Sequence, residues 1–310
     1  KFVIYFIPLT LFFLFLFWPY LWHDPFNNLL FAFSKLSSIV FSYSNLYAGK
    51  FILSLNIPWH YPLVWIGITT PVIVIVLFLF GLFFILKRIL TRIIKLDDNL
   101  NDIWRGENEM LDIYYLSIFL LSIIIYIKKG LGYDGWRHLY FIYPSMIMTA
   151  LYALYYWSLF LKSTASKIAI FSLIILNLTY LVFWNYKYHP HQYVYFNLIF
   201  KSKFYNNYDM DYWGISNRTS LEYIINNNLK YPIKIITKSF SSLEMSSLIL
   251  SEEDKSKISI THNLKEADFI ITNYMPRRSK DFFIDKKKYK KYYELLVDNK
   301  AINSVYQKVR

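Results

Sequence analysis

The sequence predicts an α-helical polytopic membrane protein with about five transmembrane helices, one interfacial amphipathic helix and a small C-terminal α/β soluble domain. Three observations support this class: 55% of the 310 residues are hydrophobic, 21% are aromatic, and five long stretches are almost free of charge. Soluble domains average about 25% charged residues, whereas this chain has 18%. The sequence contains no Cys, which excludes disulfides, thiolate metal sites and cysteine nucleophiles.

Five stretches meet the length that a helix needs to cross a bilayer, about 20 apolar residues. The first ends in Trp18-Pro19-Tyr20-Leu21-Trp22, which is typical of an interfacial aromatic belt rather than of a signal-peptide cleavage site. Asp112 lies at the edge of the third stretch. The predicted spans, which make residues 1–197 the transmembrane region, cover residues 2–22, 61–86, 110–127, 139–161 and 168–186.

Basic residues in the short loops predict the orientation of these spans. Loops 87–108 and 162–167 hold seven Lys and Arg, against five in loops 23–60 and 128–138 on the opposite side. The positive-inside rule therefore places the second pair of loops outside the cytoplasm, together with the domain formed by residues 198–310.

Two further parts complete the predicted fold. In the first loop, Asp24-Pro25 is typical of a helix start, and apolar residues from Phe26 to Phe41 recur at helical spacing, which predicts an amphipathic helix on the outer membrane surface. The C-terminal domain alternates helices and strands. We expect helices at 220–229 and 242–251, strands at 233–237, 258–261 and 269–273, and a hairpin of 292–297 with 302–309.

The net charge of +13 is not concentrated in one arm, since residues 198–310 hold 20 Lys and Arg against 13 Asp and Glu. The run Lys286-Lys287-Lys288-Tyr289-Lys290-Lys291 indicates a solvated face or a contact with anionic lipid headgroups. We therefore expect membrane lipids, and no nucleic acid, as partners.

Polar groups beside the outer membrane face are the candidate functional residues, because ionisable side chains at membrane depth are costly. Arg137 and His138 have the chemistry to bind a phosphate ester: a planar cation that forms paired hydrogen bonds, beside a second donor. The structural alternative pairs Arg137 with Asp134 as an ordinary snorkelling residue. Helix capping is likewise an alternative explanation for Asp24.

The sequence predicts no metal site and no cofactor. Its histidines are spread along the chain without an HExxH motif or an i,i+4 pair, which disfavours zinc. Walker-type and dinucleotide-binding glycine loops are absent from the sequence. The histidines nearest the predicted outer face are His23, His60, His189 and His191.

Several aromatic and polar motifs follow one another along residues 18–216: Trp18-Pro19-Tyr20-Leu21-Trp22 with Asp24-Pro25, Pro58-Trp59-His60-Tyr61-Pro62 through Trp65 to Thr69-Thr70-Pro71, Tyr133-Asp134-Gly135-Trp136-Arg137-His138, His189-Pro190 with Tyr193-Val194-Tyr195-Phe196-Asn197, and Asp211-Tyr212-Trp213-Gly214-Ile215-Ser216. In this order they resemble the GT-C superfamily of polyprenyl-phosphate-sugar-dependent glycosyltransferases. The likeness is to the bacterial family-39-like branch related to protein O-mannosyltransferases and aminoarabinose transferases. Residues after about 217 add only a general α/β likeness.

The resemblance implies a transferase of the bacterial inner membrane that moves a sugar from a polyprenyl-phosphate carrier to an extracytoplasmic protein, lipid or glycan acceptor. It implies donor-phosphate binding by Arg137 and His138, with Asp134 orienting Arg137. It places the general base, a carboxylate, upstream of Lys1, so that the chain would be the C-terminal part of a larger enzyme. The residues implied for the sugar or lipid path are Trp22, Asp24, Trp59, His60, Tyr61, Tyr195 and Asn197.

Two other functions are compatible with the same pattern. A non-catalytic membrane scaffold would use residues 198–310 to hold a partner outside the cytoplasm. A transporter is disfavoured, because charged or helix-breaking positions inside the spans are few, with Pro71 and Gly81 as exceptions. For the aromatic candidates, an interfacial belt explains the same residues.

Overall fold

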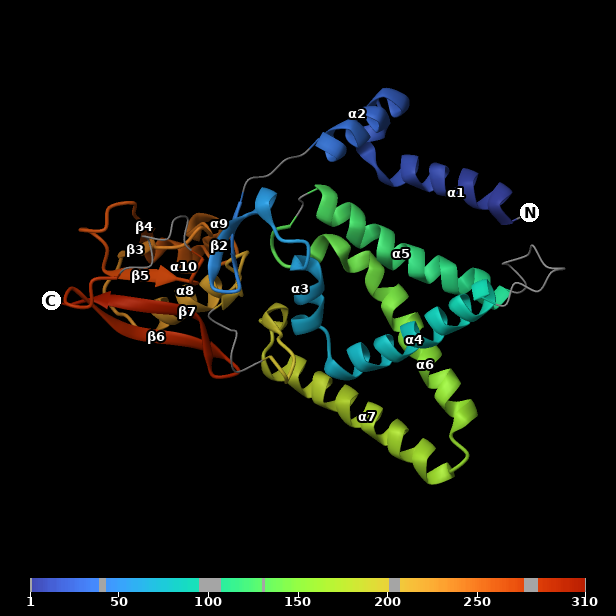
Figure 1. The fold of residues 1–310 in the computed structure, drawn as a ribbon. Coiled ribbons are helices and arrows are strands. Elements are labelled where there is room, and N and C mark those ends of the chain that lie inside the picture. The colour runs from blue at the N-terminus through green and yellow to red at the C-terminus, as the bar shows by residue number, and fades with distance from the viewer. Residues whose placement is uncertain are drawn as a thin grey trace. The chain divides into compact units, whose positions relative to one another are not determined.

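A computed structural model describes residues 2–38, 43–94, 107–129, 132–200, 207–275 and 284–309 (Figure 1). The chain forms two compact units, Lys1–Ser42 and Tyr43–Arg310. The second unit contains both a helical part and a sheet-containing C-terminal part. Contacts join these two parts; for example, the indole nitrogen of Trp184 donates a hydrogen bond of 2.8 Å to Asp298 Oδ2.

The N-terminal unit is a pair of helices joined by a tight turn. The first helix ends just before Pro19, because the proline ring fixes φ and removes a backbone donor. The second begins where Asp24 Oδ1 accepts a hydrogen bond of 3.2 Å from the backbone N–H of Asn27. Helix capping, the structural alternative for Asp24, is therefore confirmed. The elements are α1 (Phe2–Phe17), η1 (Pro19–Leu21) and α2 (Pro25–Ser38).

Helix α2 has the expected amphipathic character. Phe26, Leu30 and Phe33 are exposed large apolar side chains, and Asn27 and Asn28 lie between them in the sequence. The predicted extension of this helix to Phe41 falls outside the described residues.

The helical part of the second unit follows a short hairpin. The hairpin turns at Ala48 and Gly49, which both take the left-handed conformation, with φ of 51° and 79°. The elements of this part are β1 (Ser44–Tyr47), β2 (Lys50–Leu53), η2 (Ser54–Asn56), α3 (Tyr61–Thr69), α4 (Val72–Ile94), α5 (Glu107–Lys129), η3 (Arg137–Ile142), α6 (Tyr143–Phe160), α7 (Thr164–Lys187) and η4 (Gln192–Val194).

The predicted class, an α-helical polytopic membrane protein with about five transmembrane helices, is wrong. Within the described residues, two helices are long and apolar enough to cross a membrane by length and composition, Val72–Thr91 in α4 and Thr164–Lys187, which is α7. The chain also contains a two-stranded sheet and a five-stranded sheet.

Several of the predicted stretches differ from a single continuous helix, and one of them contains a buried ion pair. Pro71 divides stretch 61–86 into α3 and α4, because a proline disfavours helical conformation in the residue before it. Stretch 139–161 opens as the 3-10 helix η3, which leaves an α-helix of 18 residues. In α5, Asp112 is buried and pairs with Arg88 of α4. Two shorter apolar segments are Ile4–Phe17 in α1 and Tyr114–Lys128 in α5.

Helices α4 and α6 approach each other closely at a glycine. A Cβ atom at Gly81 would overlap the backbone carbonyl oxygen of Thr149, so only a hydrogen atom fits between the two helices. Beyond this contact, the core of the helical part is rich in buried aromatic rings, among them Tyr61, Trp65 and Trp136.

The C-terminal part is a five-stranded mixed sheet with the order β4-β3-β5-β7-β6. Strand β3 pairs in parallel with β4 and β5, and β7 pairs antiparallel with β5 and β6. All the predicted strands are present close to their expected positions, and the predicted helix at 242–251 is shorter, with a second short helix after it. The elements are α8 (Ser216–Asn226), β3 (Ile233–Thr237), α9 (Leu243–Ser247), α10 (Glu252–Ser256), β4 (Ile258–Ile260), β5 (Phe269–Thr272), β6 (Tyr289–Val297) and β7 (Lys300–Lys308).

Replacing Gly81 with alanine tests the contact between α4 and α6. The added methyl group must push the two helices apart, and we expect a loss of about 1–3 kcal/mol in the free energy of unfolding. Thermal unfolding of the detergent-solubilised chain, followed by circular dichroism, measures this loss.

Gly67→Ala in α3 is the matched control, since nothing lies within 4 Å of a Cβ atom at Gly67. Alanine has the higher helix propensity, so this variant should be as stable as the wild type or up to about 1 kcal/mol more stable. Equal unfolding midpoints for the two variants would contradict the close approach at Gly81.

Candidate functional site

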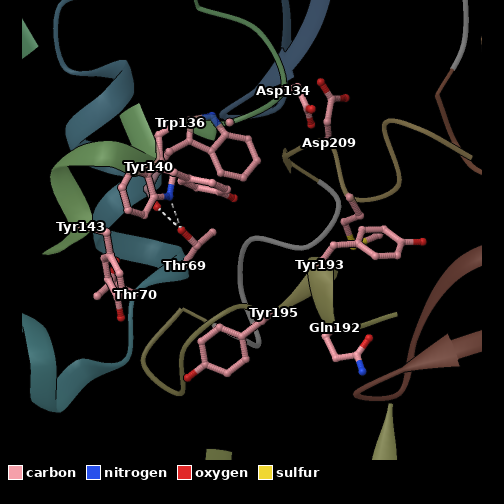
Figure 2. Close-up of a pocket in the computed structure, with 13 residues that line it drawn as sticks. Thr69, Thr70, Asp134, Trp136, Tyr140, Tyr143, Gln192, Tyr193, Tyr195 and Asp209 are labelled. Carbon is pink, nitrogen blue, oxygen red and sulfur yellow. Dashed lines mark hydrogen bonds between the residues drawn. The ribbon is translucent and has the colours of Figure 1, made fainter. Parts of the chain in front are cut away.

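A cavity of about 410 Å³ lies where the helical part of the second unit meets the segments that follow α7 (Figure 2). The end of α3, the turn before η3 and the loop around η4 supply most of its wall. The charged side chains in this wall are two carboxylates, Asp134 and Asp209, set among aromatic rings. The lining residues are Trp65, Thr69, Thr70, Asp134, Gly135, Trp136, Tyr140, Tyr143, Gln192, Tyr193, Tyr195, Asp209 and Met210.

The turn before η3 places Asp134 and Trp136 in the wall. Asp134 and Gly135 both take the left-handed conformation, with φ of 55° and 66°, which turns the chain sharply before the 3-10 helix begins. The indole N–H of Trp136 then donates to Thr69 Oγ1 at 2.8 Å, and that hydroxyl donates to the carbonyl of Trp65 at 2.7 Å. This chain of hydrogen bonds ties the turn to the end of α3.

The Asp134 carboxylate has two partners on one oxygen. Its Oδ2 atom lies 3.2 Å from Nε of Arg137 and accepts a hydrogen bond of 2.8 Å from the indole N–H of Trp213. The guanidinium carbon of Arg137 lies 4.7 Å from the centre of the Tyr133 ring and 4.8 Å from that of the Trp213 ring. The cation is therefore held between two aromatic faces.

Burial raises the pKa of Asp134, and the charge of Arg137 and the hydrogen bond from Trp213 oppose this rise. The structural alternative, a pair of Arg137 with Asp134, is thus present. It does not exclude a phosphate-binding role, because the Arg137 side chain is still 27% exposed.

Asp209 enters the cavity from the segment that runs beside β1. The backbone N–H of Leu46 donates to Asp209 Oδ2 at 2.9 Å, and the backbone N–H of Asp209 donates to the Leu46 carbonyl at 3.2 Å. Burial, reinforced by the neighbouring Asp134 charge, raises the pKa of Asp209 to about 8, although the Leu46 hydrogen bond lowers it. Figure 2 shows the two carboxylates at the same end of the cavity.

Thr70 adds a buried hydroxyl to the wall. Its side chain is 1% exposed, and its Oγ1 atom has no hydrogen-bond partner within the part of the chain that the structure describes. A buried hydroxyl without a partner costs free energy, so a ligand or a water molecule that bonded to it would be favoured.

The predicted phosphate-binding residues have different environments. Asp134 lines the cavity, and Arg137 pairs with the Asp134 carboxylate. His138 is exposed and packs edge-on against Tyr133, with ring centres 4.9 Å apart. Burial of its ring atoms, and then the charge of Arg137, lower the pKa of His138, so at pH 7 it offers a neutral donor rather than a second cation.

Of the residues implied for the sugar or lipid path, Tyr195 lines the cavity. Trp59 is exposed and packs on His60, whose Nδ1 atom lies 2.7 Å from the Tyr47 hydroxyl, and Tyr61 is buried in the core. Asn197 is fully buried, and its amide donates to the carbonyls of Gly67 and Thr70. Trp22 and Asp24 belong to the N-terminal unit, where the indole N–H of Trp22 donates to the Phe15 carbonyl and Asp24 caps α2.

Sequence reasoning missed several cavity residues. Asp209 carried one usable signal, since it lies two residues before Asp211, which belongs to one of the motifs. Thr69 and Thr70 belong, with Pro71, to one of the motifs, but they were not among the predicted site residues. The cavity also contains Gln192, which lies in the polar cluster from His189 to Asn197, and Tyr140 and Tyr143, for which the sequence carried no specific signal. Among the described residues, no group of three or more His, Asp or Glu side chains is arranged to hold a metal ion.

The pH dependence of stability tests the state of Asp209. Its pKa rises from the usual 3.8 to about 8 in the folded chain, so between these values the folded state binds more protons than the unfolded state. The stabilisation from this group is complete below the unfolded pKa and is lost as the pH rises through the folded one. We expect the unfolding midpoint to fall between about pH 5 and about pH 8, and Asp209→Asn to reduce that fall.

The control for this measurement is Glu252→Gln, which removes the carboxylate charge of a side chain that is 89% exposed and outside the cavity. It should keep the wild-type dependence on pH. An Asp209→Asn variant with the same dependence as the wild type would show that Asp209 does not carry the raised pKa.

No family model, curated protein or solved structure matches this chain. The resemblance to polyprenyl-phosphate-dependent glycosyltransferases therefore stays a prediction from its motifs. Any function must be argued from the chemistry of the cavity and of the two long apolar helices.

Proposed function

We propose that this chain is a membrane-associated glycosyltransferase, which moves a sugar from a polyprenyl-phosphate carrier to an acceptor hydroxyl. The observation that carries the proposal is the Asp209 carboxyl, with a pKa of about 8, in a cavity of about 410 Å³ lined by aromatic rings. A group that titrates near neutral pH is suited to take up a proton during a reaction. Aromatic walls with a few placed polar groups are typical of pockets for small organic ligands.

The lining of the cavity fits a sugar ring. Trp136 and Tyr140 offer apolar aromatic faces, against which the C–H groups of a sugar can pack. The Thr70 hydroxyl and the Gln192 amide offer hydrogen bonds to sugar hydroxyls, and Thr70 lacks a partner among the described residues. A neutral ligand with many hydroxyl groups would satisfy both kinds of surface.

The step that this arrangement supports is displacement at the anomeric carbon of the donor. The acceptor oxygen forms a bond to that carbon, and the bond from the carbon to the phosphate oxygen breaks. The acceptor proton passes to Asp209 in its ionised form, which is the minor form at pH 7 when the pKa is about 8, and the leaving polyprenyl phosphate keeps the electron pair of the broken bond. Asp209 is our candidate for the base within the described residues.

Arg137 is our candidate for stabilising the phosphate that leaves. Its guanidinium lies between two aromatic rings, beside the carboxylate of Asp134 at the edge of the cavity. A fixed cation near the developing negative charge lowers the barrier, because it needs no reorganisation during the step. His138, neutral at pH 7, would add a hydrogen-bond donor.

The two long apolar helices support a lipid-linked donor. In α7, Trp184 is the buried residue, and most of the other side chains of this 24-residue helix are exposed. An apolar surface of this size on a helix requires a cover, and lipid would supply one. We place the site on the extracytoplasmic side of a bacterial inner membrane, as the resemblance of the motifs implies, with a protein, lipid or glycan as acceptor.

Asp209→Asn tests the proposed base. In proteoliposomes supplied with undecaprenyl-phosphate-linked hexose or pentose, we expect the variant to release undecaprenyl phosphate about 100-fold to 10,000-fold more slowly than the wild type, as is usual on loss of a general base. Glu252→Gln, an exposed carboxylate outside the cavity, is the matched control and should keep wild-type turnover. Undiminished turnover in Asp209→Asn would remove Asp209 from the mechanism.

Thr70→Val tests recognition of the sugar, since valine keeps the shape of threonine and removes its hydroxyl. We expect a rise of about threefold to tenfold in KM, the size of one lost hydrogen bond, with little change in the unfolding midpoint. If the wild type releases no undecaprenyl phosphate from any donor tested, the non-catalytic scaffold becomes the better explanation.

A further inference from the structure

A turn of the C-terminal part, residues 211–216, reaches across to the Asp134 carboxylate. Trp213 projects from this turn with 59% of its surface exposed. Its indole N–H donates to Asp134 Oδ2 at 2.8 Å, and its ring lies 4.8 Å from the guanidinium carbon of Arg137. One side chain thus contacts both charged residues of the proposed phosphate site.

The turn is held rigid by the buried carboxylate of Asp211, which is 0% exposed. Its Oδ1 atom accepts hydrogen bonds from the Tyr193 hydroxyl at 2.8 Å and from the backbone N–H of Ile215 at 3.0 Å. Its Oδ2 atom accepts from the backbone N–H of Ser216 at 3.3 Å and from the hydroxyl of the same residue. Tyr193 lines the cavity, so Asp211 links the turn to the cavity wall as well as to the start of α8.

Residues that follow strands β3 and β5 of the sheet contact this turn. The amide of Asn273, directly after β5, donates to the Asp211 carbonyl at 2.6 Å. Gly214 takes the left-handed conformation, with φ of 69°, and a Cβ atom there would overlap the side chain of Ser241, in the loop that follows β3. The turn is therefore fixed between the loops that follow β3 and β5.

That location is where a parallel sheet usually binds a ligand. In the order β4-β3-β5, the chain leaves β3 towards one side and later returns to the other, so the crevice between the carboxyl ends of β3 and β5 is the topological switch point. Here the protein's own turn occupies the crevice. The backbone N–H of Phe240 also donates to the Met275 carbonyl at 2.5 Å, which joins the loops that follow the two strands.

We propose that the turn of residues 211–216 is a positioning element of the transferase site, in which Trp213 orients Asp134 and Arg137 for the carrier phosphate. The C-terminal α/β part is then a component of the site, because it holds the turn from behind. This inference rests on the proposed function, and Trp213 acts through its two neighbours rather than on the reacting atoms.

A double-mutant cycle tests the positioning role. Undecaprenyl phosphate alone is titrated into the detergent-solubilised full chain, and its Kd is measured by calorimetry for the wild type, Trp213→Phe, Asp134→Asn and the double variant. Phenylalanine keeps a ring over Arg137 and removes the N–H donor, so we expect Trp213→Phe to weaken binding about tenfold, or about 1.4 kcal/mol. In the Asp134→Asn background the same substitution should change Kd less than about threefold, because the carboxylate partner is already gone.

Tyr231→Phe is the matched control, since Tyr231 is an exposed aromatic residue of the C-terminal part, 45% exposed and outside the cavity lining, and the substitution likewise removes a hydrogen-bond donor. It should bind undecaprenyl phosphate as the wild type does. The unfolding midpoint of each variant shows that it is folded. We expect Trp213→Phe to fold, because the Trp213 side chain is exposed.

Three results would overturn the inference: no binding by the wild type, wild-type binding by Trp213→Phe, or an equal effect of Trp213→Phe in both backgrounds. Its failure differs from failure of the proposed function. Loss of turnover in Asp209→Asn together with an additive cycle would reject the positioning role alone. Full turnover in Asp209→Asn together with a coupled cycle would reject Asp209 as the base and leave a phosphate site positioned by Trp213.

Discussion

A carboxylate withdrawn from water needs hydrogen-bond donors or an opposite charge beside it. In this chain, the partners of the Asp134 carboxylate come from different parts of the second unit. One partner, Arg137, lies three residues further along the chain, and the other, Trp213, lies 79 residues away. The distant partner depends in turn on Asp211, Gly214 and the strands behind them. The site is therefore a product of long-range contacts, and the helical part and the sheet contribute to it together.

The sequence predicted those features of the fold that depend on local interactions. The alternation of apolar residues in Ile233–Thr237 identified β3, and Asp24 before Pro25 identified the start of α2. The predicted number of five transmembrane spans failed for a different reason. Apolar content measures what side chains prefer, whereas the continuity of a helix depends on its backbone, and Pro19 and Pro71 interrupt two of the five stretches. The ion pair of Asp112 with Arg88 joins two helices and was not visible in either stretch alone.

The candidate site was predictable to a similar extent. Asp134 and Tyr195 stood out because they belong to clusters of polar and aromatic residues, and both line the cavity. Asp209 did not stand out, because its raised pKa comes from burial among segments that are distant in the sequence, such as that of Leu46, which is 163 residues away. The role of Thr70 likewise depends on its burial. For such residues the chemical properties depend on the side chains packed around them, and a sequence pattern does not show which side chains those are.

The break between α3 and α4 has an electrostatic consequence. A helix carries a partial negative charge at its C-terminal end, on the last carbonyls, which have no partner within the helix. The end of α3 carries Thr69 and Thr70 and so faces the cavity that also holds Asp134 and Asp209. The Asn197 amide donates to the Gly67 carbonyl at 2.6 Å and to the Thr70 carbonyl at 2.9 Å, which neutralises part of this dipole. The break therefore leaves the negative end of α3 in the wall of a cavity that also holds two carboxylates, and what is left of its partial charge disfavours further negative charge there.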